Sequence, residues 1–299
     1  MINFKKISIE DKEWINPLLK ASDYSGCHHN FGNLIAWADV NKTYVAKVNE
    51  YLVVKAEMGN GEKGYFYPAG SGDKKSVIEE LISDASSNNQ KLIFLGLSPE
   101  NQEELNNLFF DRFIFEEYRD EFDYVYLIEK LVSLGGKKLH SKRNHINVFK
   151  KNNEWSFETI TAEKLRECWE MNEKWCIEQD CKDDESLTAE NCATKLFFKH
   201  FNEIGLDGGI IRVDGNIVAY TLGERLNSDT YVIHIEKAYK SIQGAYPMIN
   251  REFAAWINEQ YPEIVYINRE EDMGLEGLRK AKLSYYPVKM EEKFRAYLK

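Results

Sequence analysis

A chain of 299 residues is long for one hydrophobic core and suits two domains of roughly 150 residues each. Its composition, 43% hydrophobic and 29% charged, excludes a disordered protein, and no apolar run approaches the roughly 18 residues of a membrane span, so we expect no integral membrane association. The net charge of −10 disfavours DNA as a partner, and a polar start without a signal peptide predicts a cytoplasmic protein.

The first half of the sequence carries alternating strand and helix signals. Turn-forming residues at 68–73 precede a helix that Asp73 is placed to cap, and Pro99 opens another helix. In chain order we expect helical pieces at 15–19 and 31–37, strands at 51–54 and 65–67, a helix through 77–82, a strand at 91–97, a helix carrying residues 105–109 and a strand at 122–128.

The second half repeats this order. The Asp214-Gly215 turn between two apolar runs predicts a hairpin, and Thr188 is a plausible helix start. We expect helices at 162–179 and 189–204, strands at 209–213, 217–222 and 230–235, a loop at 240–247, a helix at 248–259, a strand at 263–268, a helix at 275–283 and a strand at 286–294. The repeated pattern predicts two domains, residues 1–135 and 136–299, the second opening with a basic crossover segment at 136–153.

The five cysteines predict neither a disulfide framework nor a metal site. Cys168, Cys176, Cys181 and Cys192 crowd one region, but their separations lack the paired spacing of a zinc ribbon. Cys168 and Cys176 share a tryptophan-containing helix, where thiols usually pack as small apolar groups. No metal is expected.

Two levels of resemblance follow from these elements. A hairpin, then a strand running into a glycine-bearing loop that starts a helix, resembles the N-acetyltransferase (GNAT) fold. More specifically, the chain resembles the family named for the C-terminal domain of phosphatidylglycerol lysyltransferase in residues 30–37 (NFGNLIAW), 68–73 (PAGSGD), 122–126 (FDYVY), 136–144 (GKKLHSKRN) and 268–285 (NREEDMGLEGLRKAKLSY). The resemblance implies an α/β (α+β) fold of two tandem GNAT-like domains with mixed central sheets flanked by helices.

The resemblance also implies a function. Named relatives move lysine from charged tRNA to a lipid headgroup, and related peptidoglycan-interpeptide aminoacyltransferases use two tandem GNAT-like domains. An acyl- or aminoacyltransferase-like protein is therefore expected, with a small amine or amino acid as ligand, tRNA as a candidate partner, and aminoacyl-tRNA or acetyl-coenzyme A as the donor rather than a tightly bound cofactor. Two alternatives stay open: a non-catalytic protein that binds or senses a small amine or amino acid, and a coenzyme A-dependent N-acetyltransferase.

The glycine loop before the helix at 248–259 is the candidate cofactor site. In the acetyltransferases that the fold resembles, backbone N–H groups of this loop hold the cofactor pyrophosphate at a helix N-terminus. Gln243, Gly244 and Ala245 are the corresponding residues here. Ser241 and Tyr246 depart from the usual pattern, so a plain strand-to-helix turn explains the loop equally well.

Three ionisable residues near the middle of the second predicted sheet are candidate catalytic groups. His234 and Glu236 alternate along residues 231–237, which predicts that both side chains share one face, and Glu224 ends the preceding strand. A carboxylate or imidazole at this place would deprotonate an attacking amine or bind its charged form. The alternative is that all three are hydrogen-bonded or solvent-facing residues of an amphipathic strand.

The segment after the strand at 263–268 supplies further candidates. Asn268, Glu270 and Asp272 are expected to bind a cationic substrate, although acids also favour the first turn of a helix. Arg279 is a candidate for gripping a carboxylate or phosphate, or else lies on an exposed helix face. Tyr285 lies near the place where some acetyltransferases keep a tyrosine acid, and a core tyrosine is the alternative.

The crossover segment holds the candidate anion contacts. Lys138, Lys142 and Arg143 would meet tRNA phosphates, with solvated linker charge as the alternative. The apolar Ile146 and Phe149 in the same stretch predict an ordered helix with one basic face. We expect the chemistry in the second domain, with donor and acceptor meeting at a cleft between the domains.

Overall fold

The computed structural model describes residues 1–57 and 61–299 and divides them into two compact units. Unit one comprises Met1–Asp123, Glu271–Leu275 and Met290–Lys299, and unit two comprises Tyr124–Glu270 and Glu276–Lys289. This division differs from the predicted boundary between residues 135 and 136, because the C-terminal segment folds with the first unit. No helix in the described part of the chain is both long and apolar enough to cross a membrane.

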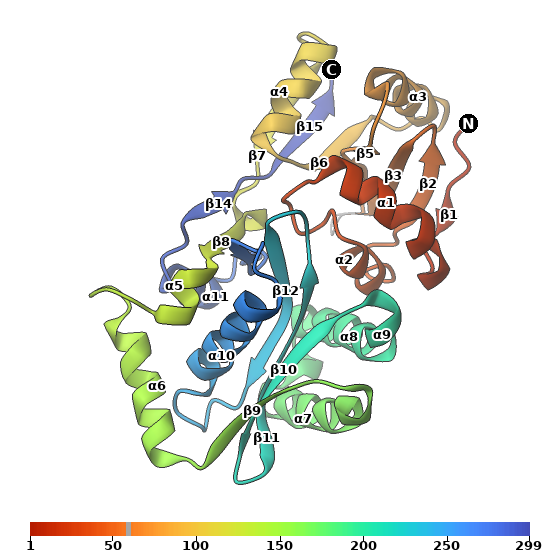
Figure 1. The fold of residues 1–299 in the computed structure, drawn as a ribbon. Coiled ribbons are helices and arrows are strands. Elements are labelled where there is room, and N and C mark those ends of the chain that lie inside the picture. The colour runs from red at the N-terminus through yellow and green to blue at the C-terminus, as the bar shows by residue number, and fades with distance from the viewer. Residues whose placement is uncertain (58–60) are drawn as a thin grey trace. The chain divides into compact units, whose positions relative to one another are not determined.

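Unit one is a mixed sheet with helices packed against it (Figure 1). Its strands are β1 (Lys5–Lys6), β2 (Tyr44–Val48), β3 (Tyr51–Glu57), β4 (Lys63–Phe66), β5 (Ala69–Gly70), β6 (Ile93–Leu97), β7 (Phe113–Glu117) and β15 (Phe294–Leu298). Its helices are α1 (Lys12–Ser22), α2 (Phe31–Ala36), α3 (Lys74–Ser87) and α4 (Pro99–Leu108), with short 3₁₀ helices η1 (Ile9–Asp11) and η2 (Arg119–Glu121). The strand order is β1-β2-β3-β4-β6-β15-β7, and β5 pairs with β3.

Unit two has the same kind of architecture. Its sheet has the order β14-β8-β13-β12-β11-β10-β9. The strands are β8 (Asp123–Leu127), β9 (Trp155–Thr159), β10 (Asp207–Val213), β11 (Asn216–Arg225), β12 (Thr230–Ala238), β13 (Tyr266–Asn268) and β14 (Lys289–Glu291). The helices are α5 (Ile128–Ser133), α6 (His140–Asn152), α7 (Leu165–Glu178), α8 (Glu185–Lys199), α9 (Phe201–Ile204), α10 (Ala245–Gln260) and α11 (Glu276–Leu283), with 3₁₀ helices η3 (Ala162–Lys164) and η4 (Cys181–Asp183). These two mixed sheets flanked by helices confirm the predicted fold class.

Local signals placed most helix starts correctly. Asp73 accepts a hydrogen bond from the backbone N–H of Ser76 and so caps α3, and Pro99 is the first residue of α4. The start expected at Thr188 is wrong, because Asp184 caps the helix one turn earlier by accepting from the N–H of Leu187. The apolar residues of α3 and β6 meet in a core in which Val77, Ile78, Leu81 and Phe94 are fully buried.

Each sheet contains a strand from the other half of the sequence. The strand expected at 122–128 forms as β8, but it pairs antiparallel with β13 of unit two. The strand expected at 286–294 is divided between β14 and the start of β15, and β15 lies between β6 and β7 in the sheet of unit one (Figure 1). Each sheet contains a parallel pair, β4 with β6 in unit one and β12 with β13 in unit two.

Candidate functional site

The candidate site of unit two lies where the parallel strands β12 and β13 separate. The two strands pair only from Thr230 to Val232 and from Tyr266 to Asn268. Beyond this point β12 continues to Ala238 while β13 has ended. Side chains from the second half of β12 therefore face those of the residues that follow β13. Ligands of α/β sheets usually bind at the carboxyl ends of strands in such places.

A β-bulge separates two of the predicted catalytic residues. The pairing of β11 with β12 shifts by one residue next to Leu222, which leaves His234 as an extra residue in β12. His234 stacks on Phe197 of α8 with ring centroids 4.8 Å apart, whereas Glu236 accepts a hydrogen bond from Asn250 of α10. Because α8 and α10 cover opposite faces of the sheet (Figure 1), the expectation that both side chains share a face is wrong.

His234 is held between two carboxylates. Its Nδ1 lies 2.8 Å from Glu270 Oε1, and its Nε2 lies 3.2 Å from Glu224 Oε1. Burial lowers the pKa of His234, but the hydrogen bonds to Glu224 and Glu270 outweigh burial and raise this pKa to about 9. The ring is thus an imidazolium at neutral pH, with both nitrogens engaged, and is unsuited to act as a general base there.

On the opposite face Glu236 is engaged by a residue that the sequence analysis did not select. Arg269 donates from Nη2 to Glu236 Oε1 at 2.9 Å, and its guanidinium lies over the rings of Tyr126 and Tyr285. Burial lowers the pKa of Arg269, but the charge of Glu236 outweighs it and raises this pKa, so the guanidinium stays charged. The signal available in the sequence was the place of Arg269, directly after a buried strand in the segment with the longest family resemblance.

Two polar atoms beside Glu236 have no hydrogen-bond partner among the described residues. They are Nη1 of Arg269 and Oδ1 of Asn250, and both are buried. The orientation of the Asn250 amide follows from chemistry, because the carboxylate of Glu236 only accepts and must therefore face Nδ2 at 3.0 Å. The cluster offers one unfilled donor and one unfilled acceptor, and buried polar groups are rarely left in that state.

Tyr285 and Lys142 complete this face. Tyr285 is buried and the Lys142 ammonium lies 4.1 Å from its ring centroid. Burial raises the pKa of Tyr285 and keeps its hydroxyl protonated. Burial, together with the charge of Arg269, lowers the pKa of Lys142. The structure thus brings Glu236, Tyr285 and Lys142 together with Arg269 and Asn250.

Other predicted substrate-binding residues do not join this cluster. Asn268 is fully buried and accepts the N–H of Glu270 at 2.7 Å, which shapes the turn after β13. Asp272 belongs to unit one, where it is fully buried and bonds the N–H of Gly274 and the guanidinium of Arg119. Arg279 is partly exposed on α11.

The candidate cofactor loop packs closely against helix α6. Gly244 has φ +86°, and a Cβ added to it would lie 2.4 Å from the backbone oxygen of His145 in α6. The N–H of Ala245 already donates to Ile242 O at 3.2 Å, and Gln243 is exposed. Glycine is therefore required here for a left-handed backbone and for the close approach of α6.

The crossover segment forms the predicted helix, α6, and its basic residues differ in their surroundings. Lys138 is exposed, with its ammonium 5.1 Å from the ring centroid of Tyr286. Arg143 donates to the carbonyl oxygens of Leu134 and Gly136, just beyond the C-terminus of α5. Its charge therefore stabilises a helix end, where carbonyl groups lack partners.

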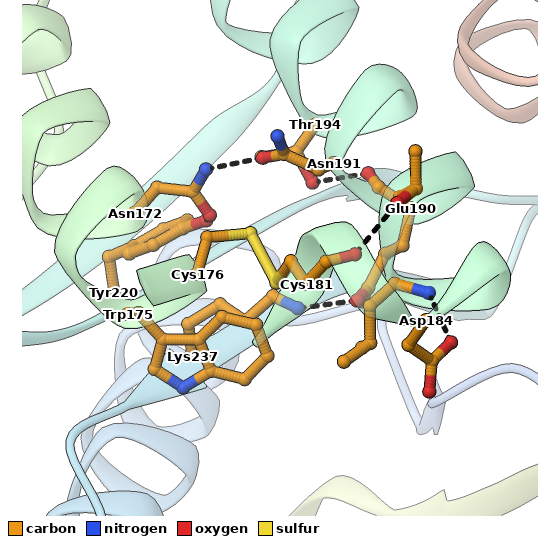
Figure 2. The surroundings of a disulfide bond; sticks show 12 residues. Asn172, Trp175, Cys176, Cys181, Asp184, Glu190, Asn191, Thr194, Tyr220 and Lys237 are labelled. Carbon is orange, nitrogen blue, oxygen red and sulfur yellow. Dashed lines mark hydrogen bonds and ion pairs between the residues drawn. A yellow bond between two sulfur atoms is a disulfide. The ribbon is translucent and has the colours of Figure 1, made fainter. Parts of the chain in front are cut away.

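The cysteine prediction needs a correction. Cys176 and Cys181 form a disulfide between the last turn of α7 and η4, with their Cα atoms 5.1 Å apart (Figure 2). The same region holds Lys237 of β12, whose buried ammonium contacts Glu190 and lies 3.7 Å from the ring centroid of Trp175 (Figure 2). The spacing of the cysteines alone did not indicate this pair, since the turn between the helices brings them together.

Comparison with known proteins identifies a family and relatives that this chain resembles. A family model described as the C-terminal part of phosphatidylglycerol lysyltransferase matches residues 20–297. An uncharacterized protein of Mycoplasmoides gallisepticum is 23% identical over 266 residues, which cover 76% of this chain and 81% of that protein.

Solved structures agree with this match. A conserved protein of unknown function from Bacteroides thetaiotaomicron is 42% identical, with full coverage of both chains and a TM-score of 0.94. The C-terminal domain of a putative lysylphosphatidylglycerol synthetase from Agrobacterium fabrum is 13% identical, covers 97% of this chain and 92% of its own, and has a TM-score of 0.69. L-PGS from Bacillus licheniformis is 15% identical with 90% and 92% coverage and a TM-score of 0.62. The fold is acyl- or aminoacyltransferase-like.

Proposed function

The chain belongs to the family of the phosphatidylglycerol lysyltransferase C-terminal domain, and from this premise we propose that it transfers an aminoacyl group from aminoacyl-tRNA to a small amine or hydroxyl acceptor. The observation that carries the proposal is the pair of unfilled polar atoms, Arg269 Nη1 and Asn250 Oδ1, beside Glu236. Acyl transfer needs a donor aimed at the carbonyl oxygen and an acceptor for the N–H or O–H of the nucleophile.

The proposed reaction assigns a part to each residue of the cluster. The acceptor attacks the ester carbonyl, the bond from that carbon to the tRNA ribose oxygen breaks, and a new C–N or C–O bond forms. Arg269 Nη1 donates to the carbonyl oxygen as it gains negative charge, and Asn250 Oδ1 accepts from the nucleophile. The proton released by the nucleophile goes to the ribose oxygen, with the protonated hydroxyl of Tyr285 as its relay.

In this reaction Glu236 positions its neighbours and does not act as the predicted general base. Its two oxygens bond Arg269 and Asn250, at 2.9 and 3.0 Å, so that it orients both side chains. The Glu224–His234–Glu270 cluster lies on the other face, and we give it a structural part, because its imidazolium is fixed at both nitrogens.

The surroundings of Gly244 favour tRNA over coenzyme A as the donor. A pyrophosphate at the N-terminus of α10 would need space that α6 fills, and the N–H of Ala245 is already used. The exposed Lys138, which lies just before α6, and the basic residues of that helix suit the phosphates of a polyanion instead.

The first measurement is thermal stabilisation by charged tRNA, free lysine and acetyl-coenzyme A at matched low salt, because a ligand that binds the folded state raises the melting temperature. A shift with charged tRNA is the expected result. A shift with lysine alone would replace the transferase by an amino-acid-binding protein, and a shift with acetyl-coenzyme A alone would indicate an acetyltransferase.

Activity is tested next with tRNA charged with labelled amino acids, by following the loss of tRNA-bound label when a small amine is added. Arg269→Lys keeps a charge beside Glu236 but removes the planar fork, and we expect about 10²-fold slower transfer. The double variant Glu236→Gln with Arg269→Gln removes the ion pair without leaving a lone buried charge and should be as slow. Glu259→Gln, at an exposed position of α10, is the matched control. If Arg269→Lys transfers the aminoacyl group at the normal rate, the role assigned to Arg269 as donor to the carbonyl oxygen is wrong.

A further inference from the structure

The disulfide of unit two closes a very short loop. Cys176 lies in the last turn of α7, and Cys181 begins η4 five positions later. The N–H of Gln179 donates to the carbonyl oxygen of Trp175 at 3.1 Å, so backbone hydrogen bonding already shapes this turn. A crosslink stabilises a protein mainly by restricting the unfolded chain, and that gain is smallest for short loops. The bond is therefore poorly suited to be a permanent staple of the fold.

The two cysteines of the disulfide differ in their access to solvent. Cys176 is half-buried, and the residues that follow it, Ile177 and Glu178, are exposed. Cys181 is 5% exposed. A thiolate from solution therefore reaches the disulfide from the side of Cys176, and Cys181 is the sulfur that leaves.

The disulfide ties the end of α7 to the start of α8 through η4. Thr188 in the second turn of α8 donates from Oγ1 to the carbonyl oxygen of Cys181 at 2.7 Å, and Asn172 of α7 donates from Nδ2 to Asn191 Oδ1 at 2.8 Å. The buried side chains of α8 are in its second half, at Ala193, Thr194, Phe197 and Phe198. The first half of α8 is therefore attached mainly by polar contacts and by the disulfide, and such weakly packed segments open most readily.

The same two helices cover a buried lysine of β12. Lys237 is 5% exposed, and its ammonium contacts the carboxylate of Glu190 in α8 (Figure 2). The ammonium also lies 3.7 Å from the ring centroid of Trp175, the residue before Cys176 in α7. A buried charge needs its partner, so Lys237 must take up water if the first half of α8 carries Glu190 away. The cover of Lys237 thus consists of the two elements that the disulfide joins.

We propose that Cys176 and Cys181 form a reversible redox pair that exchanges with a small thiol such as glutathione, and that reduction releases residues 185–191 of α8 and uncovers Lys237. A glutathione thiolate attacks Cys176 Sγ, the bond between the two protein sulfurs breaks, and Cys181 leaves as a thiolate that takes up a proton. A second glutathione attacks the glutathione sulfur of the mixed disulfide and releases Cys176. Two electrons pass to the protein, glutathione disulfide is the product, and the reverse sequence restores the bond. The proposed transferase reaction uses neither cysteine, and the measurements below need no catalysis.

The first test counts thiols in buffers of varied ratio of reduced to oxidised glutathione. The full chain is equilibrated, quenched in acid, unfolded and labelled with a maleimide for mass spectrometry. Three of its five cysteines are free when the disulfide is formed, so we expect one transition from three labelled thiols to five. Cys192→Ser, which removes an exposed thiol of α8, is the matched control and should show the same transition with one label fewer. Three labels in reduced glutathione alone, or five in glutathione disulfide alone, would overturn the proposal.

The second test compares the structure of the oxidised and reduced chains. Hydrogen exchange of residues 181–191 should be about ten-fold faster in the reduced chain. Acetylation of Lys237 by an N-hydroxysuccinimide ester should also accelerate, whereas Lys195, exposed on α8, should react equally in both states. Cys176→Ala and Cys181→Ala should each match the reduced chain in either buffer. Equal exchange and equal acetylation of Lys237 in the two redox states would show that the disulfide controls neither α8 nor Lys237, and the proposal would be wrong.

Discussion

At the scale of single residues, two buried histidines should give the stability of the protein opposite pH dependences. For His234 the folded pKa is about 9 against an ordinary value of 6.5. Between pH 6.5 and 9 the folded state therefore holds a proton that the unfolded chain has released. The stabilisation of the folded state by this proton is complete below pH 6.5 and is lost as the pH rises through 9. The difference corresponds to about 3 kcal/mol of unfolding free energy.

The measurement compares urea unfolding of the unaltered chain and of His234→Gln. The stability advantage of the unaltered chain should shrink by about 3 kcal/mol between pH 6.5 and 9.5, whereas His145→Gln, at an exposed position of α6, should leave the pH dependence unchanged. An imidazole NMR signal of His234 that titrates near pH 6.5 would contradict the assignment.

His29 should act with the opposite sign. Burial lowers its pKa from 6.5 to about 4, so the unfolded chain binds the proton first as the pH falls. The free energy of unfolding that the neutral His29 ring contributes is fully present above pH 6.5. About 3 kcal/mol of it is lost as the pH falls from 6.5 to 4. In His29→Gln, whose amide still donates to Tyr67 O, acid unfolding of unit one should begin at lower pH than in the unaltered chain. The pH midpoint from circular dichroism is the measurement, and an unchanged midpoint would show that the ring is not buried in its neutral form.

Residue types and their spacing selected several members of the site, but their grouping depends on the bulge. Glu236 and Tyr285 were selected and lie in one cluster, and His234 was selected and lies in another. Period-two alternation predicts one face for His234 and Glu236, and a single extra residue in β12 reverses that relation. Bulges arise from the pairing of two strands, so the sequence of β12 alone did not indicate this one.

At the scale of elements, Gly244 tests whether the loop before α10 serves packing or ligand binding. In Gly244→Ala the new Cβ would lie 2.4 Å from His145 O on a backbone with φ +86°. We expect a loss of about 2 kcal/mol or more of unfolding free energy, since both the left-handed strain and the clash with α6 must be accommodated. Chemical denaturation without any ligand is the measurement.

Gly277→Ala in α11 is the matched control, because a Cβ there meets nothing within 4 Å. It should leave stability unchanged or raise it by about 0.5–1 kcal/mol, because alanine favours helix. Wild-type stability of Gly244→Ala would contradict the packing account and would return the loop to the candidate cofactor site.

Helices were more predictable than the pairing of strands. The caps of α3 and α4 act within one turn of chain, so Asp73 and Pro99 were sufficient signals. In contrast, β2, β7 and β9 were not predicted, and β8 was assigned to the wrong sheet. A strand's partner is chosen by long-range contacts that local patterns do not contain.

At the scale of the whole molecule, the positions of β8 and β15 explain why the two units are not two continuous halves of the chain. β15 is hydrogen-bonded to β6 on one side and β7 on the other, and Ala296 within it is fully buried. The sheet of unit one is therefore complete only when the last ten residues of the chain are present. Unit two, in turn, takes β8 from the end of the first half.

A chain ending at residue 291, which keeps β14, should therefore lose unit one and keep unit two. The deletion removes the strand between β6 and β7, leaving backbone groups of both without partners, and it removes Lys293, whose ammonium balances the buried charge of Asp123. In hydrogen exchange followed by mass spectrometry, peptides from β3, β4 and β6 should exchange freely, whereas peptides from β10, β11 and β12 stay protected. Deleting Lys299 alone, which removes an exposed ion pair with Asp111, is the control and should leave both units protected. Protection of β6 in the shortened chain would mean that unit one folds without β15, and exposure of β11 would mean that unit two depends on unit one for its stability.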